Sequence, residues 1–281
     1  AGKTVFITSL VANLLDRGRM PALRAAADGS IRAAWLQPQP DDTVPRFEFE
    51  RHLSALTGPD PHWPEGTRHV SELRLSLRVQ PRGLLGGLRG TQTLHLDIVD
   101  YPGEWLLDLR LMERSFAEWS AEVLERMPGR PGAEAYLAAL EGLDPAARFD
   151  EPTAQRLAAA STAHLAAARA AGFSDCTPGR VLLPGEMEGS PALTFAPLPP
   201  VEGRSPLARE FERRFDAYKK SVVRPFFRDH FARIDRQVVL VDVLGAVHAG
   251  PRAVEDMRRA MADILSAFRP GRAGSVSYTH L

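Results

Sequence analysis

Several features that would assign a protein to a broad class are scarce in this sequence. Its 281 residues include one cysteine, Cys176, so the chain can form no internal disulfide and offers no thiolate cluster to a metal. Basic and acidic residues number 35 each, so no net charge attracts nucleic acid or an acidic membrane surface. These absences favour a cytoplasmic protein that binds anions at a local site.

Long hydrophobic runs and metal-ligand spacings are absent as well. No run reaches the roughly 18 consecutive apolar residues of a membrane-spanning helix, and no signal peptide is recognisable. The eight histidines show no spacing such as H-x-x-x-H. A basic run from Arg213 to Arg228 is interleaved with aromatic residues, and we interpret it as a solvated helix face with a core stripe. We therefore expect no transmembrane segment, no metal besides magnesium and no nucleic-acid partner.

What is present is an ordinary globular composition, with 44% hydrophobic and 25% charged residues, and a length that allows one large domain or two modest ones. The sequence opens without an initiator methionine and runs directly into an apolar helical pattern. Residues 276–281 (VSYTHL) resemble a translated sequencing adapter, so we expect them to be non-native. We expect a fragment that begins inside its own phosphate-binding loop.

The first residues carry that expectation. Apolar side chains recur at helical spacing over residues 4–17, which predicts a helix that opens from Gly2-Lys3-Thr4. This tripeptide matches the end of G-x-x-x-x-G-K-[ST], where backbone N–H groups surround phosphates, the lysine reaches the outer phosphates and the hydroxyl binds magnesium. We assign Ala1, Gly2, Lys3 and Thr4 to nucleotide binding, and Thr4 also to the metal. Taken alone, the tripeptide is equally an ordinary helix N-terminus with an exposed lysine.

A second motif follows two alternating segments. Residues 73–79 and 91–100 alternate between apolar and polar side chains, which predicts an antiparallel pair of strands joined by a glycine-rich turn at 83–90. The second strand ends at Asp100, which begins a D-x-x-G pattern completed by Gly103. In such a loop the aspartate holds magnesium, and the glycine N–H faces the terminal phosphate and reports its loss. The alternative interpretation is a simple turn, which proline and glycine favour.

Two further residues are assigned to the site by position. Glu104 follows Gly103 where many GTPases carry the residue that orients the attacking water, so it is the candidate catalytic residue. Phosphate charge would repel this carboxylate unless a cation screens it, so Glu104 could instead turn away and pair with a basic residue. Thr67 lies in a possible switch segment, and its hydroxyl could reach magnesium.

The rest of the chain predicts a core with insertions. Residues 20–70 read as an insertion of short helices and loops, while residues 238–244 (VVLVDVL) have the length and continuity of a buried parallel strand. We expect a first part of the core at 1–105, a mostly helical insert at 106–236 and a second part of the core at 237–275. The helices expected after Gly103 span 106–127, 133–141, 153–171, 207–234 with a kink at Pro225, and 252–268, with short strands around 181–183 and 193–195.

Five blocks, in order, carry a resemblance to a known family. GKTVFITSLV, SELRLSLR, LDIVDYPGEWLLDL, VLLPGEMEGSPAL and VVLVDVLGAVHAG together resemble the YcjX-like family of stress-associated P-loop nucleoside triphosphatases. The resemblance covers nearly the whole chain. It implies an α/β fold of the GTPase-like P-loop class, with a mixed sheet and a large α-helical insertion, and it places Lys3 and Thr4 on phosphates and Mg²⁺ and Asp100 and Gly103 in the sensing loop.

The resemblance also implies a ligand and a role. GTP or GDP with Mg²⁺ is expected, although the family's T-K-x-D base-reading motif is absent from the sequence, so ATP stays possible. The expected function is hydrolysis of a nucleoside triphosphate by a stress-related switch or regulator whose helical insert contacts an unknown protein partner. Two alternatives stay open: a nucleotide-dependent scaffold that hydrolyses poorly, and an ATP-dependent enzyme.

Overall fold

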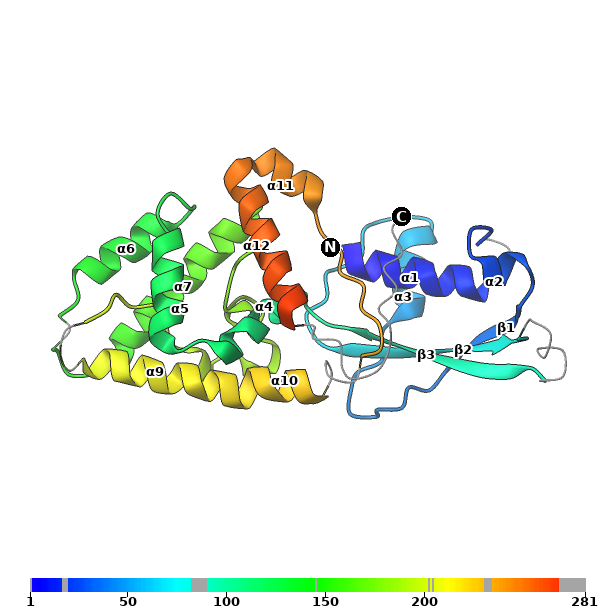
Figure 1. Ribbon diagram of the computed structural model, residues 1–281, viewed down its shortest axis with the longest axis horizontal. Coiled ribbons are helices and arrows are strands. Elements are labelled where there is room, and N and C mark those ends of the chain that lie inside the picture. The colour runs from blue at the N-terminus through cyan, green and yellow to red at the C-terminus, as the bar shows by residue number, and fades with distance from the viewer. Residues whose placement is uncertain are drawn as a thin grey trace. The chain divides into compact units, whose positions relative to one another are not determined.

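The structure is a computed structural model that divides into two compact units, Ala1–Pro102 and Gly103–Leu281 (Figure 1). It describes residues 2–16, 20–81, 90–144, 146–201, 203, 205–229 and 234–267. The expected turn at 83–90, apart from Gly90, and the expected non-native tail lie outside the described residues. Each unit is described by itself.

A three-stranded antiparallel sheet organises the first unit, in the order β1-β2-β3 (Figure 1). Strand β2 (Ser71–Val79) pairs with β3 (Gln92–Asp100), so the antiparallel pair predicted from the alternation is confirmed. Strand β1 (Ile31–Gln37) pairs with the other edge of β2 and lies in the segment expected to contain only short helices and loops. That expectation was wrong because pairing with β2 outweighs a weak local pattern.

Helix α1 (Gly2–Leu15) confirms the helix predicted at the start of the chain. Ile7, Val11 and Leu14 recur at helical spacing on one face and are buried. Two core clusters among the described residues of this unit contain these side chains. One also contains Phe47, Phe49 and Leu73, and the other contains Ile31, Leu75 and Leu77. The short helices α2 (Arg24–Ala27) and α3 (Phe49–Thr57) complete the unit. This packing holds the first turn of α1 in place against the unit's core.

The second unit is mostly helical among its described residues. Its helices, in chain order, are α4 (Glu104–Leu107), the 3₁₀ helix η2 (Asp108–Glu113), α5 (Phe116–Arg126), α6 (Ala133–Glu141), α7 (Glu151–Ala170), α8 (Gly179–Leu182), the 3₁₀ turns η3 (Gly185–Met187) and η4 (Pro191–Leu193), α9 (Pro206–Tyr218), the π-helical turn η5 (Lys219–Val223), α10 (Arg224–Asp229), α11 (Val243–Ala249) and α12 (Pro251–Ala267). Among the helices of the described part, none combines the length and the hydrophobicity that crossing a bilayer requires.

Several helices and strands predicted for this unit differ from those that the structure shows. The helix expected over 106–127 consists of three pieces, the last of which begins at the capping box of Ser115. The short strands expected around 181–183 and 193–195 are absent from these described segments, which form α8, η4 and irregular backbone. The predicted interruption near Pro225 is the π-helical turn before it, because proline has no N–H to donate within the helix.

Aromatic side chains form much of the second unit's core. Trp119 of α5 stacks on Phe215 of α9 with ring centroids 5.1 Å apart, and Phe195 meets both rings edge-on. Phe211 and Tyr218 are also fully buried on α9. The core stripe predicted for the basic run is therefore confirmed for this helix, whereas Arg214 of that run is buried and pairs with Glu151 and Glu210.

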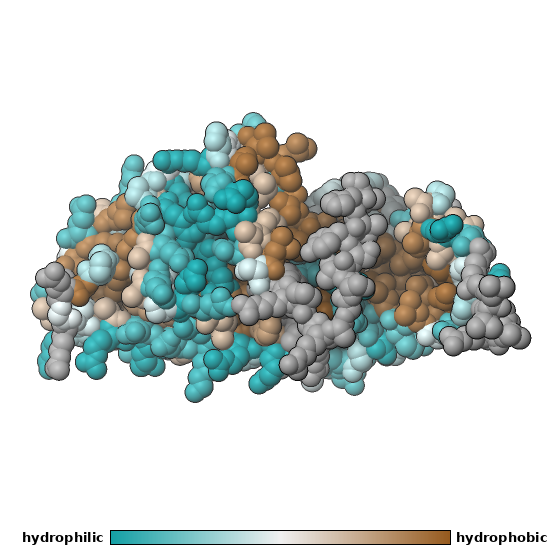
Figure 2. Space-filling model, viewed as in Figure 1, coloured by the Kyte–Doolittle hydropathy of each residue, from teal (hydrophilic) through white to brown (hydrophobic). Residues whose placement is uncertain are grey.

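The predicted buried strand at 238–244 is not formed. Residues 238–242 have no regular structure, and α11 begins at Val243 with the Asp242 carboxylate accepting the N–H of Gly245 at 2.8 Å. Most side chains of this run are exposed, by 61% at Val238 and 82% at Leu244, and Figure 2 shows hydrophobic side chains gathered over α11. A buried strand needs neighbouring strands to satisfy its backbone, and none of the described strands pairs with this segment.

Candidate functional site

The first turn of α1 contains the predicted phosphate-binding residues. The helix begins at Gly2, so Gly2, Lys3 and Thr4 contribute N–H groups that have no partner within the helix, at the end where the helix dipole is positive. This end of a helix favours phosphate. Ala1, the remaining predicted residue, lies outside the described residues.

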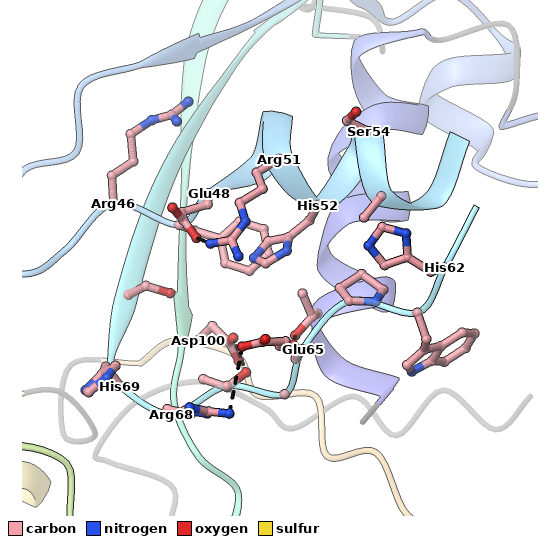
Figure 3. Close-up of a pocket in the computed structure, with 18 of the residues that line it drawn as sticks. Arg46, Glu48, Arg51, His52, Ser54, His62, Glu65, Arg68, His69 and Asp100 are labelled. Atoms are coloured by element: carbon pink, nitrogen blue, oxygen red, sulfur yellow. Dashed lines mark hydrogen bonds and ion pairs between the residues drawn. The ribbon is translucent and has the colours of Figure 1, made fainter. Parts of the chain in front are cut away.

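Three residues predicted to bind magnesium meet in one pocket of the first unit. Thr4 of α1, Thr67 of the loop before β2 and Asp100 at the end of β3 line an open pocket of about 900 Å³ (Figure 3). The Thr67 hydroxyl donates to the Asp100 carboxylate at 2.5 Å, although 33 residues separate them in the chain. The Thr4 hydroxyl donates to the backbone oxygen of Glu65 at 3.5 Å. Three separate chain segments thus bring their oxygen atoms to the same pocket.

Burial makes Asp100 the carboxylate of this pocket whose charged form a bound cation would stabilise most. Asp100 is only 4% exposed, and burial raises the pKa of its carboxyl. The hydrogen bond from Thr67 and the nearby positive charges of Lys3 and His52 act in the opposite direction without cancelling the effect of burial. A bound divalent cation would stabilise the charged carboxylate.

The donor set fits magnesium. The hydroxyls of Thr4 and Thr67 and the carboxylate of Asp100 are oxygen donors, and Mg²⁺ prefers one or two carboxylates completed by phosphate oxygens and water. Within the described ranges no group of three or more His, Cys, Asp or Glu side chains could form a metal cage. The arrangement therefore suits an ion shared between the protein and a phosphate ligand.

His52 belongs to this pocket and was missed by the sequence reasoning. It comes from α3, lines the pocket and packs on Phe47 with ring centroids 5.0 Å apart (Figure 3). Burial lowers the pKa of its imidazole, while the carboxylates of Glu48 and Asp100 partly oppose that shift. Its spacing from the buried Phe49 places both residues on one face of a helix, and this is the signal that could have identified it.

Gly103 and Glu104 lie in the second unit. Gly103 caps α4 with helical backbone angles, φ −62° and ψ −27°, and Glu104 is the first residue of that helix. The Glu104 carboxylate forms an ion pair with Arg169 of α7. This pairing with a basic residue is one of the two arrangements that the sequence left open for Glu104.

Comparison with known proteins identifies the family. A sequence model of the YcjX-like family, DUF463, matches residues 1–279. The chain belongs to the YcjX-like family. The resemblance inferred from the five sequence blocks is therefore confirmed, and it extends over both units.

Two curated relatives of this YcjX-like chain are each named Ras-like GTPase YcjX. The protein from Escherichia coli (strain K12) is 40% identical over 288 residues, and the protein from Shewanella oneidensis (strain MR-1) is 36% identical over 299 residues. Both alignments cover 97% of this chain and 62% of the relative. The chain thus spans less than two thirds of the length of these relatives.

Proposed function

We propose that this chain is the phosphate- and magnesium-binding part of a P-loop nucleoside triphosphatase that binds and hydrolyses GTP. The observation that carries the proposal is the convergence in one pocket of Thr4, from the first turn of α1, with Thr67 and Asp100. The names of the two relatives support GTP as the nucleotide. The role that we propose with it is that of a cytoplasmic, stress-related switch or regulator whose helical unit contacts a protein partner.

Each residue has a distinct role in this proposal. Lys3 and the free N–H groups of α1 bind the outer phosphates, while Thr4, Thr67 and Asp100 hold the metal. When bound, magnesium neutralises charge on the phosphate oxygens. The N–H of Gly103 reads the terminal phosphate, and Thr67 links the loop before β2 to the same ligand, so loss of that phosphate releases both segments.

The proposal predicts that Lys3→Ala in the full-length protein abolishes triphosphate binding, because Lys3 is the point charge that offsets the outer phosphates. Titration of a fluorescent GTP analogue in the presence of Mg²⁺ measures the effect. Lys220→Ala, which removes an exposed lysine of the second unit, is the matched control and should bind as the parent does. Unchanged affinity in Lys3→Ala would remove the P-loop assignment.

A competition experiment tests which nucleotide base the protein prefers and whether binding needs Mg²⁺. GTP should displace the fluorescent analogue at much lower concentration than ATP, and omission of Mg²⁺ should weaken both. Equal displacement by ATP would instead favour an ATP-dependent enzyme.

A nucleotide-dependent scaffold that hydrolyses poorly is the second candidate function. The observation in its favour is the ion pair between Glu104 and Arg169, since Arg169 engages one oxygen of the carboxylate that would otherwise be available to orient water. Under our main proposal Glu104 leaves Arg169 when the triphosphate binds and then acts on water. Single-turnover hydrolysis of bound GTP by the full-length protein separates the two functions.

A further inference from the structure

The segment that begins at Gly103 is held tightly within the second unit, starting with Trp105. The indole of Trp105 is buried, and its N–H donates to the backbone oxygen of Leu183 at 3.1 Å. The guanidinium carbon of Arg180 lies 3.3 Å from the centroid of the Trp105 ring, and Phe226 meets this ring edge-on at 5.7 Å. Because Arg180 belongs to α8 and Leu183 follows it, Trp105 is fixed to α8 by a cation–π contact and a hydrogen bond.

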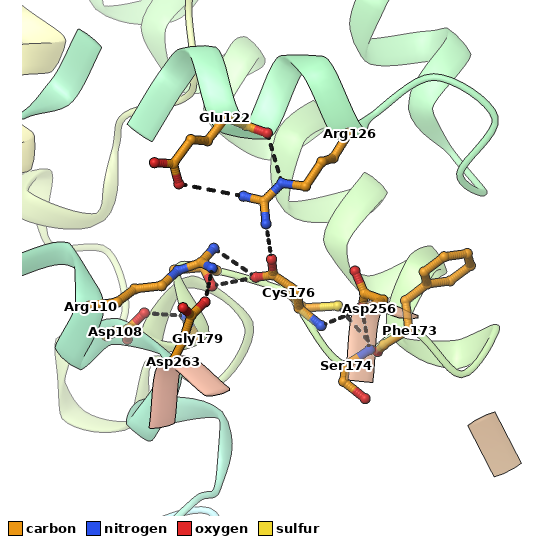
Figure 4. A network of polar contacts seen from close by, with 12 residues as sticks. Asp108, Arg110, Glu122, Arg126, Phe173, Ser174, Cys176, Gly179, Asp256 and Asp263 are labelled. Atoms are coloured by element: carbon orange, nitrogen blue, oxygen red, sulfur yellow. Dashed lines mark hydrogen bonds and ion pairs between the residues drawn. The ribbon is translucent and has the colours of Figure 1, made fainter. Parts of the chain in front are cut away.

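Asp108, at the other end of this segment, also binds α8. Its buried carboxylate accepts the N–H of Gly179 at 2.7 Å (Figure 4). It also accepts the N–H of Arg180 at 3.2 Å and the hydroxyl of Tyr218 at 2.6 Å. Gly179 and Arg180 begin α8, so their N–H groups have no acceptor within that helix and depend on Asp108. A shift of Asp108 would therefore leave buried polar groups without partners.

The start of α8 also packs directly against the first residue of the segment. A Cβ atom added to Gly179 would lie 2.1 Å from the backbone oxygen of Glu104, a distance far below van der Waals contact. The Glu104 side chain is in turn paired with Arg169 of α7. Residues 104–108 are thus bound to α8 at their beginning, middle and end, and they cannot change position unless α8 moves with them.

We propose that Arg180 is a positioning residue for the nucleotide-sensing loop. Through Trp105 it fixes the residues that follow Gly103, and through α8 it transmits the presence or loss of the terminal phosphate to the helical unit. The inference rests on the function proposed for the Asp100–Gly103 loop and adds a regulatory route to it. α8 is the element whose position both the loop and the helical unit influence.

Two measurements on the full-length protein test this route. The first is amide hydrogen exchange at residues 178–183, compared between the GDP state and the state with a non-hydrolysable GTP analogue. The N–H groups of Gly179 and Arg180 report whether Asp108 still holds α8. We expect exchange at these residues to differ between the two states. Equal exchange in the two states overturns the proposal regardless of how any variant folds.

The second measurement compares Arg180→Ala and Arg180→Lys with a control. Arg180→Ala should slow single-turnover hydrolysis by about tenfold while GTP affinity stays near the parental value, since a misplaced segment impairs the reaction more than binding. Lysine keeps a cation over the ring and should restore part of the rate. Arg258→Ala removes an arginine that is 69% exposed and paired with Glu255, and it should change neither quantity.

The outcomes separate the two proposals. Parental hydrolysis rates in both Arg180 variants would overturn the positioning role while the GTPase proposal stands. Failure of the unmodified protein to bind GTP would overturn the proposed function and the inference with it.

Discussion

Of the four aspartates that are buried among the described residues, Asp100, Asp108 and Asp175 differ in the groups that surround their carboxylates. Asp175 is 3% exposed at its side chain and pairs with Arg110 and Arg126, and these arginines hold the pKa of its carboxyl below the usual range in spite of burial. Asp108 has only uncharged donors in direct contact, and burial raises the pKa of its carboxyl to about 6. The pKa of Asp100 is also raised by burial. Of the three, Asp100 alone lines the pocket, which is why it is the candidate metal ligand.

The raised pKa of Asp108 predicts a pH dependence of stability. Its pKa is about 6 in the folded protein and roughly 4 in the unfolded chain. At pH values between these two pKa values, Asp108 binds more protons in the folded state than in the unfolded chain. The free energy of unfolding should therefore fall as pH rises, by up to about 3 kcal/mol. The raised pKa of Asp100 also makes the free energy of unfolding fall as pH rises. The lowered pKa of His52 has the opposite effect, because the free energy of unfolding rises with pH as its imidazole loses a proton.

Urea unfolding of the parent and of Asp108→Asn across this pH range isolates the contribution of Asp108. The variant cannot titrate at this position, so the difference in unfolding free energy between the two proteins should change with pH from about 4 to about 6. A constant difference would show that Asp108 does not titrate in this range.

At the scale of elements, caps and close contacts decide where the helices begin. Asp150 starts α7 by accepting the N–H of Thr153 at 2.9 Å, and Ser205 starts α9 in the same way. Such caps are visible in the sequence because the cap and its partner lie three residues apart. The start of α8 differs, because it depends on Asp108 and Glu104, which are distant in the chain.

The close approach at α8 predicts that Gly179→Ala destabilises the protein. The added methyl group would overlap the backbone of Glu104, which cannot rotate away, so α8 must shift at a cost of about 1–3 kcal/mol. Gly142→Ala is the matched control: its φ is −86° and no atom lies within 4 Å of the added Cβ. The control should change the free energy of unfolding in urea by less than about 1 kcal/mol. Equal effects of the two substitutions would contradict the predicted overlap.

At the scale of the whole molecule, one polar network joins distant parts of the second unit. Asp175, in the loop after α7, pairs with Arg110 of η2 and Arg126 of α5, and Arg110 also pairs with Asp263 of α12 (Figure 4). Asp256 of α12 accepts the N–H groups that begin this loop. The network therefore connects segments that the chain separates by more than a hundred residues.

Removal of one charge from this network should be costly. Asp175→Asn leaves two arginines without their buried partner, so we expect a loss of about 3–5 kcal/mol in the free energy of unfolding. Glu255→Gln breaks an exposed ion pair on α12 and should cost less than about 1 kcal/mol. Urea unfolding of both variants at neutral pH makes the comparison. A loss of similar size in both variants would show that the network adds little to stability.

The sequence by itself determined much of the local structure and selected the candidate phosphate and metal residues. Helical spacing predicted α1, α6 and α7, alternation predicted β2 and β3, and two short motifs selected Lys3, Thr4 and Asp100. These features depend on residues within one or two turns or along one strand, so a linear pattern is enough to reveal them. Membership of the YcjX-like family was evident from five blocks of sequence for the same reason.

Only the tertiary structure decided which of these elements meet. β1 exists because β2 offers it an edge, the apolar run at 238–244 is exposed because no described strand pairs with it, and the hydrogen bond between Thr67 and Asp100 joins segments 33 residues apart. Glu104 had two possible environments, and the position of Arg169 selected one. Contacts of this kind depend on how whole elements pack, and the burial and hydrogen bonding that decide them are not encoded at neighbouring positions.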